Sequence, residues 1–376
     1  MTTTLRFIVD PIVAPVPGYV GRYARDLARA IVATAPDGCL VEGLVSAAPP
    51  EELERVQHEV PGLAELVRAP LPRRELAAAW QLGVPTPQSA GFVHAPNLFA
   101  PLRKHSRDEG TQIVVTVHDL LAWTHPEALS GTSVAWHKGM LKRARKHADA
   151  VVVPTHALAD QLGMVADLGD RVRVIPTAPR DGLEVGADAS CRRDELGLPS
   201  EYLVVSGTLE PRKGVVDVLA ALGRPDAPDL PLVVIGPESW GEQHLATAAE
   251  EAGVAPDRVH HVDDPEPGLL AAVLSGATAF VAPSHDEGSG TSLIEAFSLG
   301  VPVVHSDIPA YAEVAADAGL AVDDDDDFVD GLLAAITAVV DGPALAERLV
   351  IAGHDRARAF TWTDSAERVW QLHADL

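Results

Sequence analysis

Short apolar segments alternate with helical stretches along almost the whole chain, and this alternation is the feature that most constrains the fold. Continuous apolar segments of this length are typical of strands buried in a parallel sheet. In the first helical stretch, Ala24, Leu27, Ala28, Ile31 and Val32 recur with the spacing of one helix face. We therefore expect an α/β fold with parallel sheets and right-handed crossovers. The expected strands are Leu5–Val9, Gly91–His94, Ile113–Val117, Ala150–Pro154, Arg171–Ile175, Tyr202–Ser206, Leu232–Ile235, Val259–His261, Ala279–Ala282 and Val301–His305.

The length of 376 residues is enough for two α/β domains. A segment rich in Pro, Gly and Asp and without periodicity, residues 177–190, predicts the boundary between them. We expect an N-terminal domain over residues 1–185 and a C-terminal domain over residues 186–358. Residues 359–376 read as one further helix, which we expect to pack back on the N-terminal domain.

The charge balance excludes one class of partner. The chain has 29 basic and 54 acidic side chains, a net charge of −25, whereas broad nucleic-acid binding needs a basic surface. Nearly all of this acidity follows residue 185. Cys39 and Cys191 are too few for a disulfide framework. Because the sequence shows neither a signal peptide nor an apolar segment long enough to span a membrane, we expect a cytoplasmic protein.

One segment of the second half combines glycines, carboxylates and a helix start. Ser284–Ala296 follows an expected strand, and Gly288 and Gly290 allow a ligand to approach the backbone and the helix start. Glu287 and Glu295 are placed to touch different parts of one elongated ligand. Because carboxylates repel phosphate, we expect them to accept hydrogen bonds from sugar hydroxyls. For Glu295, stabilisation of the helix dipole is the alternative.

A second glycine-rich turn, Gly207–Gly214, also follows a strand and contains Arg212 and Lys213 next to each other. A planar guanidinium beside a point charge suits a diphosphate, and a surface ion pair is the alternative. The turn is not a Walker A loop, and no GxGxxG follows the first strand, which argues against a nicotinamide dehydrogenase. The acidic run Asp323–Asp327 is expected to be a solvated loop, because it lacks the spacing of a metal site.

Three features of the first half complete the set. His118 follows a strand at its carboxyl end, where open α/β sheets bind ligands, and a structural histidine is the alternative. Gly18–Tyr23 is a glycine turn that leads into the first helix. The basic stretch Lys138–Lys146 is expected to be a solvated helix face. The other reading is contact with an anionic lipid surface or a phosphate-bearing acceptor.

Four segments in this order resemble glycosyltransferase family 4, the retaining enzymes of the GT-B fold. They are Gly18–Tyr23, His94–Asn97 with Val117–Asp119, Gly207–Gly214, and the pair Glu287 and Glu295. The resemblance implies two Rossmann-like, doubly wound parallel-sheet domains facing across a cleft, with the acceptor on the N-terminal domain and the nucleotide sugar on the C-terminal one. Within the family, the combination of the His118-Asp119 motif with the segment Gly207–Lys213 is similar to mannosyl- and rhamnosyl-type enzymes of polysaccharide assembly.

The resemblance implies a reaction and roles for individual residues. A hexose, for example mannose, would move from a nucleotide-diphosphate sugar to a hydroxyl of a glycan, lipid-linked or small-molecule acceptor, without a metal ion or other cofactor. The implied catalytic residues are His118 near the transferred sugar, Arg212 and Lys213 on the diphosphate, and Glu287 on the donor sugar. The implied donor-binding residues are Gly18, Gly21, Gly207, Thr208, Ser289, Gly290, Thr291 and, on the ribose, Glu295. Backbone groups of Val262–Gly268 would hold the base.

The sequence departs from the family pattern at two places. Ser289 stands where the family usually has an aromatic residue, and Thr291 begins a polar pair where the family has an apolar residue followed by Pro. The identity of the donor sugar is therefore left open. Thr208 stands where many relatives have an arginine, which leaves diphosphate neutralisation to Arg212, Lys213 and helix starts. Two other functions remain as alternatives: a non-catalytic sugar-nucleotide-binding subunit of a glycosylation complex, and a nucleotide-sugar epimerase of the same fold.

Overall fold

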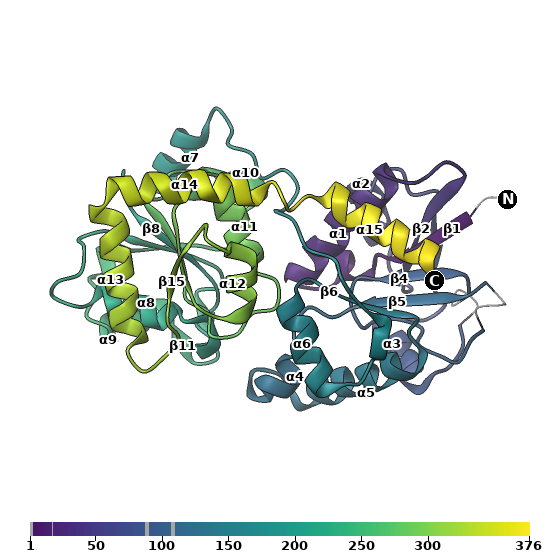
Figure 1. The fold of residues 1–376 in the computed structure, drawn as a ribbon. Helices are drawn as coiled ribbons and strands as arrows, with labels where there is room; N and C mark the ends of the chain where they lie inside the picture. The colour runs from purple at the N-terminus through teal and green to yellow at the C-terminus, as the bar shows by residue number, and fades with distance from the viewer. Residues whose placement is uncertain (1–2, 17, 87–89, 107–109) are drawn as a thin grey trace. The chain divides into compact units, whose positions relative to one another are not determined.

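The computed structural model describes residues 3–16, 18–86, 90–106 and 110–376. The chain divides into two compact units, each an alternation of strands and helices (Figure 1). The first unit consists of residues 1–177 and 361–376, and the second consists of residues 178–360. The α/β class expected from the sequence is confirmed in both units.

The first unit contains a seven-stranded sheet in the order β3-β2-β1-β4-β5-β6-β7, and all neighbouring strands are parallel. Its strands are β1 (Thr3–Ile8), β2 (Cys39–Val45), β3 (Glu65–Arg68), β4 (Phe92–Ala95), β5 (Gln112–Thr116), β6 (Ala150–Val153) and β7 (Val172–Val174). The chain moves outward from β1 in one direction through β2 and β3, and in the other direction from β4. Open sheets bind ligands at the carboxyl ends of the strands where this direction changes.

Helices cover both faces of this sheet. They are α1 (Gly18–Ala33), α2 (Pro50–Glu59), α3 (Arg73–Leu82), α4 (Leu121–Thr124), α5 (Gly131–His147), α6 (His156–Val165) and α15 (Trp362–Asp375), with short 3-10 turns at Asp10–Val13, Pro126–Ala128 and Gly169–Arg171. Figure 1 shows the yellow helix α15 beside α1, and Trp370 Nε1 donates a hydrogen bond to the Ile31 carbonyl at 3.1 Å. Thr361 caps α15 by accepting a hydrogen bond from the Asp364 amide. The C-terminal helix is therefore part of the first unit.

A buried chain of hydrogen bonds also ties α15 to the sheet. His373 Nδ1 lies 3.1 Å from Gln112 Oε1, and His94 Nδ1 lies 3.3 Å from His373 Nε2. Burial lowers the pKa of both histidines, to about 4 for His373. His94 also stacks on Phe7 with ring centroids 5.6 Å apart. His94, which belongs to one of the resembling segments, therefore serves the core of this unit.

The second unit contains a six-stranded parallel sheet in the order β12-β9-β8-β13-β14-β15. Its strands are β8 (Leu203–Ser206), β9 (Leu232–Ile235), β12 (Val259–Val262), β13 (Ala279–Ala282), β14 (Val303–Ser306) and β15 (Leu320–Val322). Here β8 and β13 are direct neighbours although they are distant in sequence. The two glycine-rich loops singled out above follow these two strands, so the fold brings both loops to one edge of the sheet.

Alternate residues of the β8 and β13 strands supply two separate cores, one on each face of the sheet. Leu203, Val205 and Val281 belong to the core under α8 (Val215–Leu222) and α13 (Phe328–Asp341), whereas Val204 and Phe280 belong to the core under α10 (Pro267–Ser275) and α11 (Thr291–Ser298). The helices are α7 (Ala189–Glu195), α8 (Val215–Leu222), α9 (Leu245–Glu251), α10 (Pro267–Ser275), α11 (Thr291–Ser298), α12 (Pro309–Ala315), α13 (Phe328–Asp341) and α14 (Pro343–Ala357), with 3-10 turns at Pro211–Lys213 and Pro256–Arg258. A short antiparallel hairpin pairs β10 (Ser239–Trp240) with β11 (Gln243–His244).

The structure differs from the sequence-based expectation at the boundary between the units. Residues 178–185 belong to the second unit and not to the first. The physical reason is Arg180, whose side chain is held by Glu295 within the second unit. The expected start of the terminal helix at residue 359 is likewise two residues early, since the first unit resumes at residue 361.

Within the described ranges, no single helix has both the length and the apolar character needed to cross a membrane. One pair, α13 with the segment Pro343–Asp375 that contains α14 and α15, meets the length and composition requirement together but is bent by 97°.

Candidate functional site

The loops after β8 and β13 are held against each other by their backbones. Gly214, which follows the 3-10 turn Pro211–Lys213, has a φ of +64°, and a Cβ at this position would lie 2.2 Å from the Pro283 carbonyl oxygen. Only glycine combines this conformation with so close an approach. The His285 amide then donates a hydrogen bond to the Arg212 carbonyl at 2.8 Å. The adjacent Arg-Lys pair is therefore fixed beside the loop that carries Glu287.

Both cations of the pair contact carboxylates. Arg212 Nε lies 2.7 Å from Glu210 Oε1, and Lys213 Nζ lies 2.5 Å from Glu287 Oε2. All four side chains are less than a quarter exposed. Burial on its own would raise the pKa of Glu287, but the charges of Lys213 and Arg212 hold that pKa below its usual value. The structure thus joins three of the predicted catalytic residues in one ionised network, with Glu210 as a member that the sequence analysis missed.

His285 binds two carboxylates from different elements. Its Nε2 lies 3.0 Å from Asp217 Oδ2 on α8, and its Nδ1 lies 2.5 Å from Asp324 Oδ1 in the loop after β15. The hydrogen bond to Asp217 raises the pKa of the His285 imidazole, whereas burial lowers it. Asp324 raises this pKa further, and its value is about 9. The acidic run Asp323–Asp327 is exposed as expected, yet one of its members has this specific contact.

The start of α11 carries the small polar residues of the predicted donor site. Gly290 precedes the helix with a φ of +61°, and Thr291 Oγ1 donates a hydrogen bond to Ser289 Oγ at 3.2 Å. Behind them, Tyr311 of α12 is 2% exposed, and burial together with the charge of Glu287 raises its pKa. Tyr311 is a second residue that the sequence analysis missed, because nothing in the sequence links α12 to this loop.

Glu295 lies on α11 and is held by an arginine. Arg180 Nε lies 2.7 Å from Glu295 Oε1 and Arg180 Nη2 lies 3.2 Å from Glu295 Oε2, so the contact is two-pronged. The Glu295 residue is 5% exposed. The alternative, in which this carboxylate only stabilises the dipole of its own helix, therefore does not account for the contact with Arg180. A carboxylate accepts roughly four hydrogen bonds, so positions remain for ligand hydroxyls beside the guanidinium.

His118 follows β5 in the first unit and is enclosed by aromatic rings. Its Nε2 lies 2.7 Å from the Pro96 carbonyl oxygen, so Nε2 carries the proton, and the buried Nδ1 has no hydrogen-bond partner among the described residues. The Tyr19 and Tyr23 rings of α1 meet it edge-on, with centroids 5.3 and 4.6 Å away. Burial lowers the pKa of His118. The residue therefore offers a neutral imidazole with a free acceptor nitrogen.

The remaining predicted residues lie in the same loops and helix starts. Gly18 begins α1 with a φ of +52°, and Gly21 is buried one turn later. Gly207 donates its amide to the Ile235 carbonyl at 2.9 Å, and Thr208 Oγ1 accepts a hydrogen bond from the Glu210 amide at 3.3 Å. The structure thus groups Gly207 and Thr208 with the Arg212 network in the second unit, and Gly18 and Gly21 with His118 in the first.

The loop Val262–Gly268, predicted to hold a base, contains a capped helix start. The Glu266 carboxylate accepts hydrogen bonds from the Gly268 and Leu269 amides and contacts Arg192. This side chain is therefore committed to α10. Across residues 3–16, 18–86, 90–106 and 110–376, no group of three or more His, Cys, Asp or Glu side chains is arranged to hold a metal ion.

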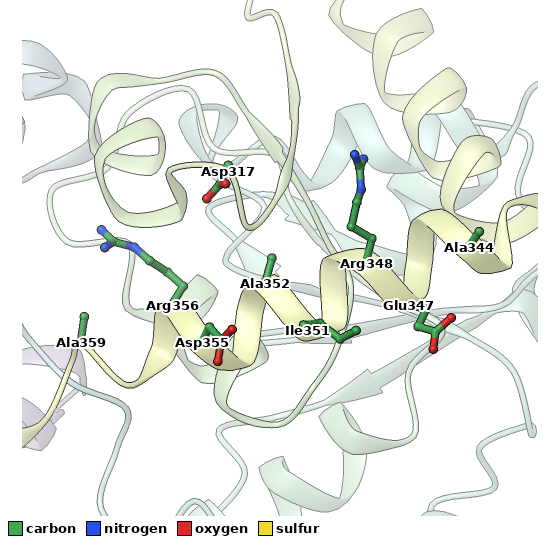
Figure 2. Close-up of a pocket in the computed structure, with 9 residues that line it drawn as sticks. All are labelled: Asp317, Ala344, Glu347, Arg348, Ile351, Ala352, Asp355, Arg356 and Ala359. Atoms are coloured by element: carbon green, nitrogen blue, oxygen red, sulfur yellow. The ribbon is translucent and has the colours of Figure 1, made fainter.

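A cavity of about 660 Å³ opens along α14 in the second unit (Figure 2). It is lined by Asp317, Ala344, Glu347, Arg348, Ile351, Ala352, Asp355, Arg356 and Ala359. Arg356 is already committed to the fold, because its guanidinium donates to the Val314 and Glu313 carbonyls and lies over the Phe360 ring. The cavity shares no residue with the predicted site.

Two doubly wound parallel sheets, with charged and glycine-rich loops at the carboxyl ends of their strands, are the architecture of GT-B glycosyltransferases. Residues 20–178 match the family model described as Glycosyltransferase Family 4, and residues 192–356 match the one described as Glycosyl transferases group 1. The chain belongs to glycosyltransferase family 4.

Individual relatives agree with this assignment. The chain is 27% identical over 385 residues to O-antigen chain mannosyltransferase B of Escherichia coli, covering 95% of both chains. It is 29% identical over 266 residues to glycogen synthase of Mycobacterium tuberculosis, covering 69% of this chain and 62% of the relative. Among solved structures, sucrose-phosphate synthase of Thermosynechococcus elongatus has a TM-score of 0.73 at 22% identity, covering 99% of this chain and 98% of its own. HepE of Anabaena, solved with UDP-glucose, has a TM-score of 0.71 at 18% identity, covering 99% of this chain and 100% of its own. The two structures bear on the fold alone.

Proposed function

We propose that this glycosyltransferase moves a hexose, with mannose as the first candidate, from a nucleotide-diphosphate sugar to an acceptor hydroxyl in glycan or glycolipid assembly, with retention at the anomeric carbon. The observation that carries the proposal is the network of Arg212, Lys213 and Glu287 at the carboxyl ends of β8 and β13. The choice of mannose is supported by the similarity to the E. coli O-antigen mannosyltransferase.

The chemical problem is the charge of the leaving group. As the bond to the sugar breaks, negative charge accumulates on the diphosphate, and Arg212 and Lys213 supply the compensating cations. Each such donor is worth about 3 kcal/mol of the barrier, by analogy with oxyanion-hole donors. Because these cations belong to the chain, we propose that the transfer needs no metal ion or other cofactor. Glu287, kept ionised by the same cations, accepts hydrogen bonds from the donor sugar.

Three further groups have roles in this proposal. The free Nδ1 of His118 accepts a hydrogen bond from a hydroxyl of the transferred sugar. Glu295, oriented by Arg180, accepts hydrogen bonds from the ribose. The backbone N–H groups of Ser289, Gly290 and Thr291, at the start of α11, contact the sugar and the phosphate.

The same network would also serve the two alternatives, a sugar-nucleotide-binding subunit without activity and an epimerase. Product analysis separates them. Transfer gives a new glycosidic bond to the acceptor, an epimerase changes the free sugar, and a silent subunit binds the donor without changing it.

Nucleotide binding is the direct test. In a thermal unfolding screen with GDP-mannose, UDP-glucose and their free nucleoside diphosphates, we expect the ligands that contain one of the two bases to stabilise the protein. At 100 times its dissociation constant, a ligand adds about 2.7 kcal/mol to the free energy of unfolding. We expect the same shift, and the same transfer rate, in the presence of EDTA. If no nucleotide sugar shifts the unfolding temperature, the proposed function is contradicted.

We also propose that the exposed basic side chains of α5 bring the enzyme to an anionic membrane surface, in keeping with a cytoplasmic protein that uses a lipid-linked acceptor. Lys138, Lys142, Arg145 and Lys146 are all exposed on this helix. Each basic residue near an anionic surface contributes about 1 kcal/mol to binding.

Vesicle co-sedimentation tests this contact. Changing Lys138, Lys142 and Lys146 together to Glu is expected to reduce binding to vesicles that contain phosphatidylglycerol by at least tenfold at low salt. The change Arg358→Glu, at the C-cap residue of α14 with an 80% exposed side chain, serves as the control and is expected to have little effect. Equal binding of the two variants would contradict the role of α5.

A further inference from the structure

We infer that His285, in its protonated form, is a positioning residue that allows a strongly acidic unit to bind a diphosphate, an inference that rests on the proposed function. The His285 side chain links α8 to the loop after β15 through Asp217 and Asp324. Its backbone amide donates a hydrogen bond to the turn that carries Arg212 and Lys213. Neither the sequence motifs nor the roles described above assign His285 a function.

The geometry places His285 between the elements that carry the diphosphate-binding cations. Asp217 is in the first turn of α8, which begins directly after Gly214, and it holds the imidazole Nε2 at 3.0 Å. Asp324 holds Nδ1 at 2.5 Å. The His285 amide donates to the carbonyl of Arg212 at 2.8 Å. Displacement of the ring would therefore move the turn that carries Arg212 and the loop that carries Glu287.

The charges of the cluster make the proton on His285 important. The cations are Arg212, Lys213 and His285, and the carboxylates are Glu210, Glu287, Asp217 and Asp324. With the imidazolium, three cations face four carboxylates. Without it, only two cations remain and two aspartates face an uncharged ring. A diphosphate approaching the neutral-ring form meets more uncompensated negative charge, which weakens its binding.

The charged groups that face the ring are Asp217 from α8 and Asp324 from the loop after β15. The third neighbour, Phe328 at the start of α13, is uncharged, with its ring centroid 5.0 Å from the imidazole. Both carboxylates favour the protonated form, and the pKa of His285 lies at about 9. The ring is therefore protonated at neutral pH, and its contribution to diphosphate binding is lost as the pH rises through about 9.

The test is the variant His285→Gln, which keeps hydrogen-bond donors but removes the charge. We expect its KM for the nucleotide sugar, and its dissociation constant for the matching nucleoside diphosphate, to rise about tenfold at pH 7.5. We expect kcat to stay within about twofold, because the lost charge acts on ground state and transition state alike. In the wild type, the dissociation constant is expected to rise between pH 8 and 10, and in the variant this rise is expected to be absent.

Two further variants separate charge from structure. Adding Asp324→Asn to His285→Gln removes one of the uncompensated carboxylates and is expected to recover a large part of the lost affinity. His354→Gln, at an exposed histidine of α14 outside the cluster, is expected to bind the diphosphate like the wild type. A variant His285→Gln with unchanged affinity, or with the same pH profile as the wild type, would overturn the inference. If the wild type itself binds no nucleoside diphosphate, the proposed function fails instead.

Discussion

The variant Lys213→Met is expected to lower kcat/KM for sugar transfer at least a hundredfold. Methionine has a similar length but no charge, so the leaving diphosphate loses one of its two cations. Removal of a comparable group in other enzymes costs a factor of about 100 to 1,000 in kcat. Initial-rate kinetics with saturating acceptor and varied donor measures the effect. Arg224→Met, which breaks a half-exposed ion pair with Asp330 in the same unit, is the matched control and is expected to have near-normal kinetics.

The structure also predicts a stability effect for this variant. Lys213→Met leaves the partly buried Glu287 carboxylate without its nearest cation, which is expected to cost about 1 kcal/mol of the free energy of unfolding. The double variant Lys213→Met with Glu287→Gln is expected to regain part of that stability but none of the activity. If the double variant recovers activity as well, the pair has a structural role only. Wild-type kinetics for Lys213→Met would contradict the assignment of the diphosphate site.

The variant Gly214→Ala is expected to lower the free energy of unfolding by about 4 kcal/mol, as the sum of a strained backbone and a steric clash. A left-handed residue with a Cβ costs roughly 1–2 kcal/mol on its own. At Gly214 the new Cβ would also lie 2.2 Å from the Pro283 carbonyl oxygen, so the loops after β8 and β13 must separate. Donor binding is expected to weaken in parallel, because Arg212 and Lys213 are in the displaced turn. Denaturant unfolding and nucleotide titration measure the two effects.

Gly197→Ala provides the control for backbone conformation. Gly197 has a φ of +65°, almost the same as Gly214, but a Cβ there meets nothing within 4 Å. We expect this variant to lose about 1 kcal/mol, the cost of the left-handed conformation alone. The difference between the two variants isolates the contact with Pro283. Equal losses in both would show that the two loops are not held together by this approach.

The sequence predicted the fold well where its strands are continuous apolar runs. Leu232–Ile235 and Ala279–Ala282 match the observed strands at both ends. The strand β2 was missed because Glu42 and Gly43 interrupt its apolar pattern. In the structure, Glu42 contacts Arg6 on the neighbouring strand at 2.8 Å, and a Cβ at Gly43 would come within 2.9 Å of Leu66. These contacts between strands depend on which strands are neighbours in the sheet, and local sequence patterns do not show this.

The candidate site shows a similar division. Residue type and position after a strand singled out Arg212, Lys213, Glu287 and His118, and the structure places each at the carboxyl end of a strand. Their partners could not be predicted in the same way. Arg180 is 115 residues away from Glu295, and it sits in a segment that the sequence suggested only as a boundary. Partners at this separation become visible only when the sheet order is known.

The membership of α15 in the first unit means that residues 178–360 form a domain inserted into another domain. The first unit is assembled from two pieces of chain, while the second is continuous. During synthesis on the ribosome, the inserted domain can therefore fold before its host, which waits for the segment containing Val369 and Leu372 to close its core. Until then the apolar face of α1 has no cover from that helix. We therefore expect completion of the first unit, rather than folding of the inserted domain, to be the step at which the newly made chain is most exposed to chaperones and proteases.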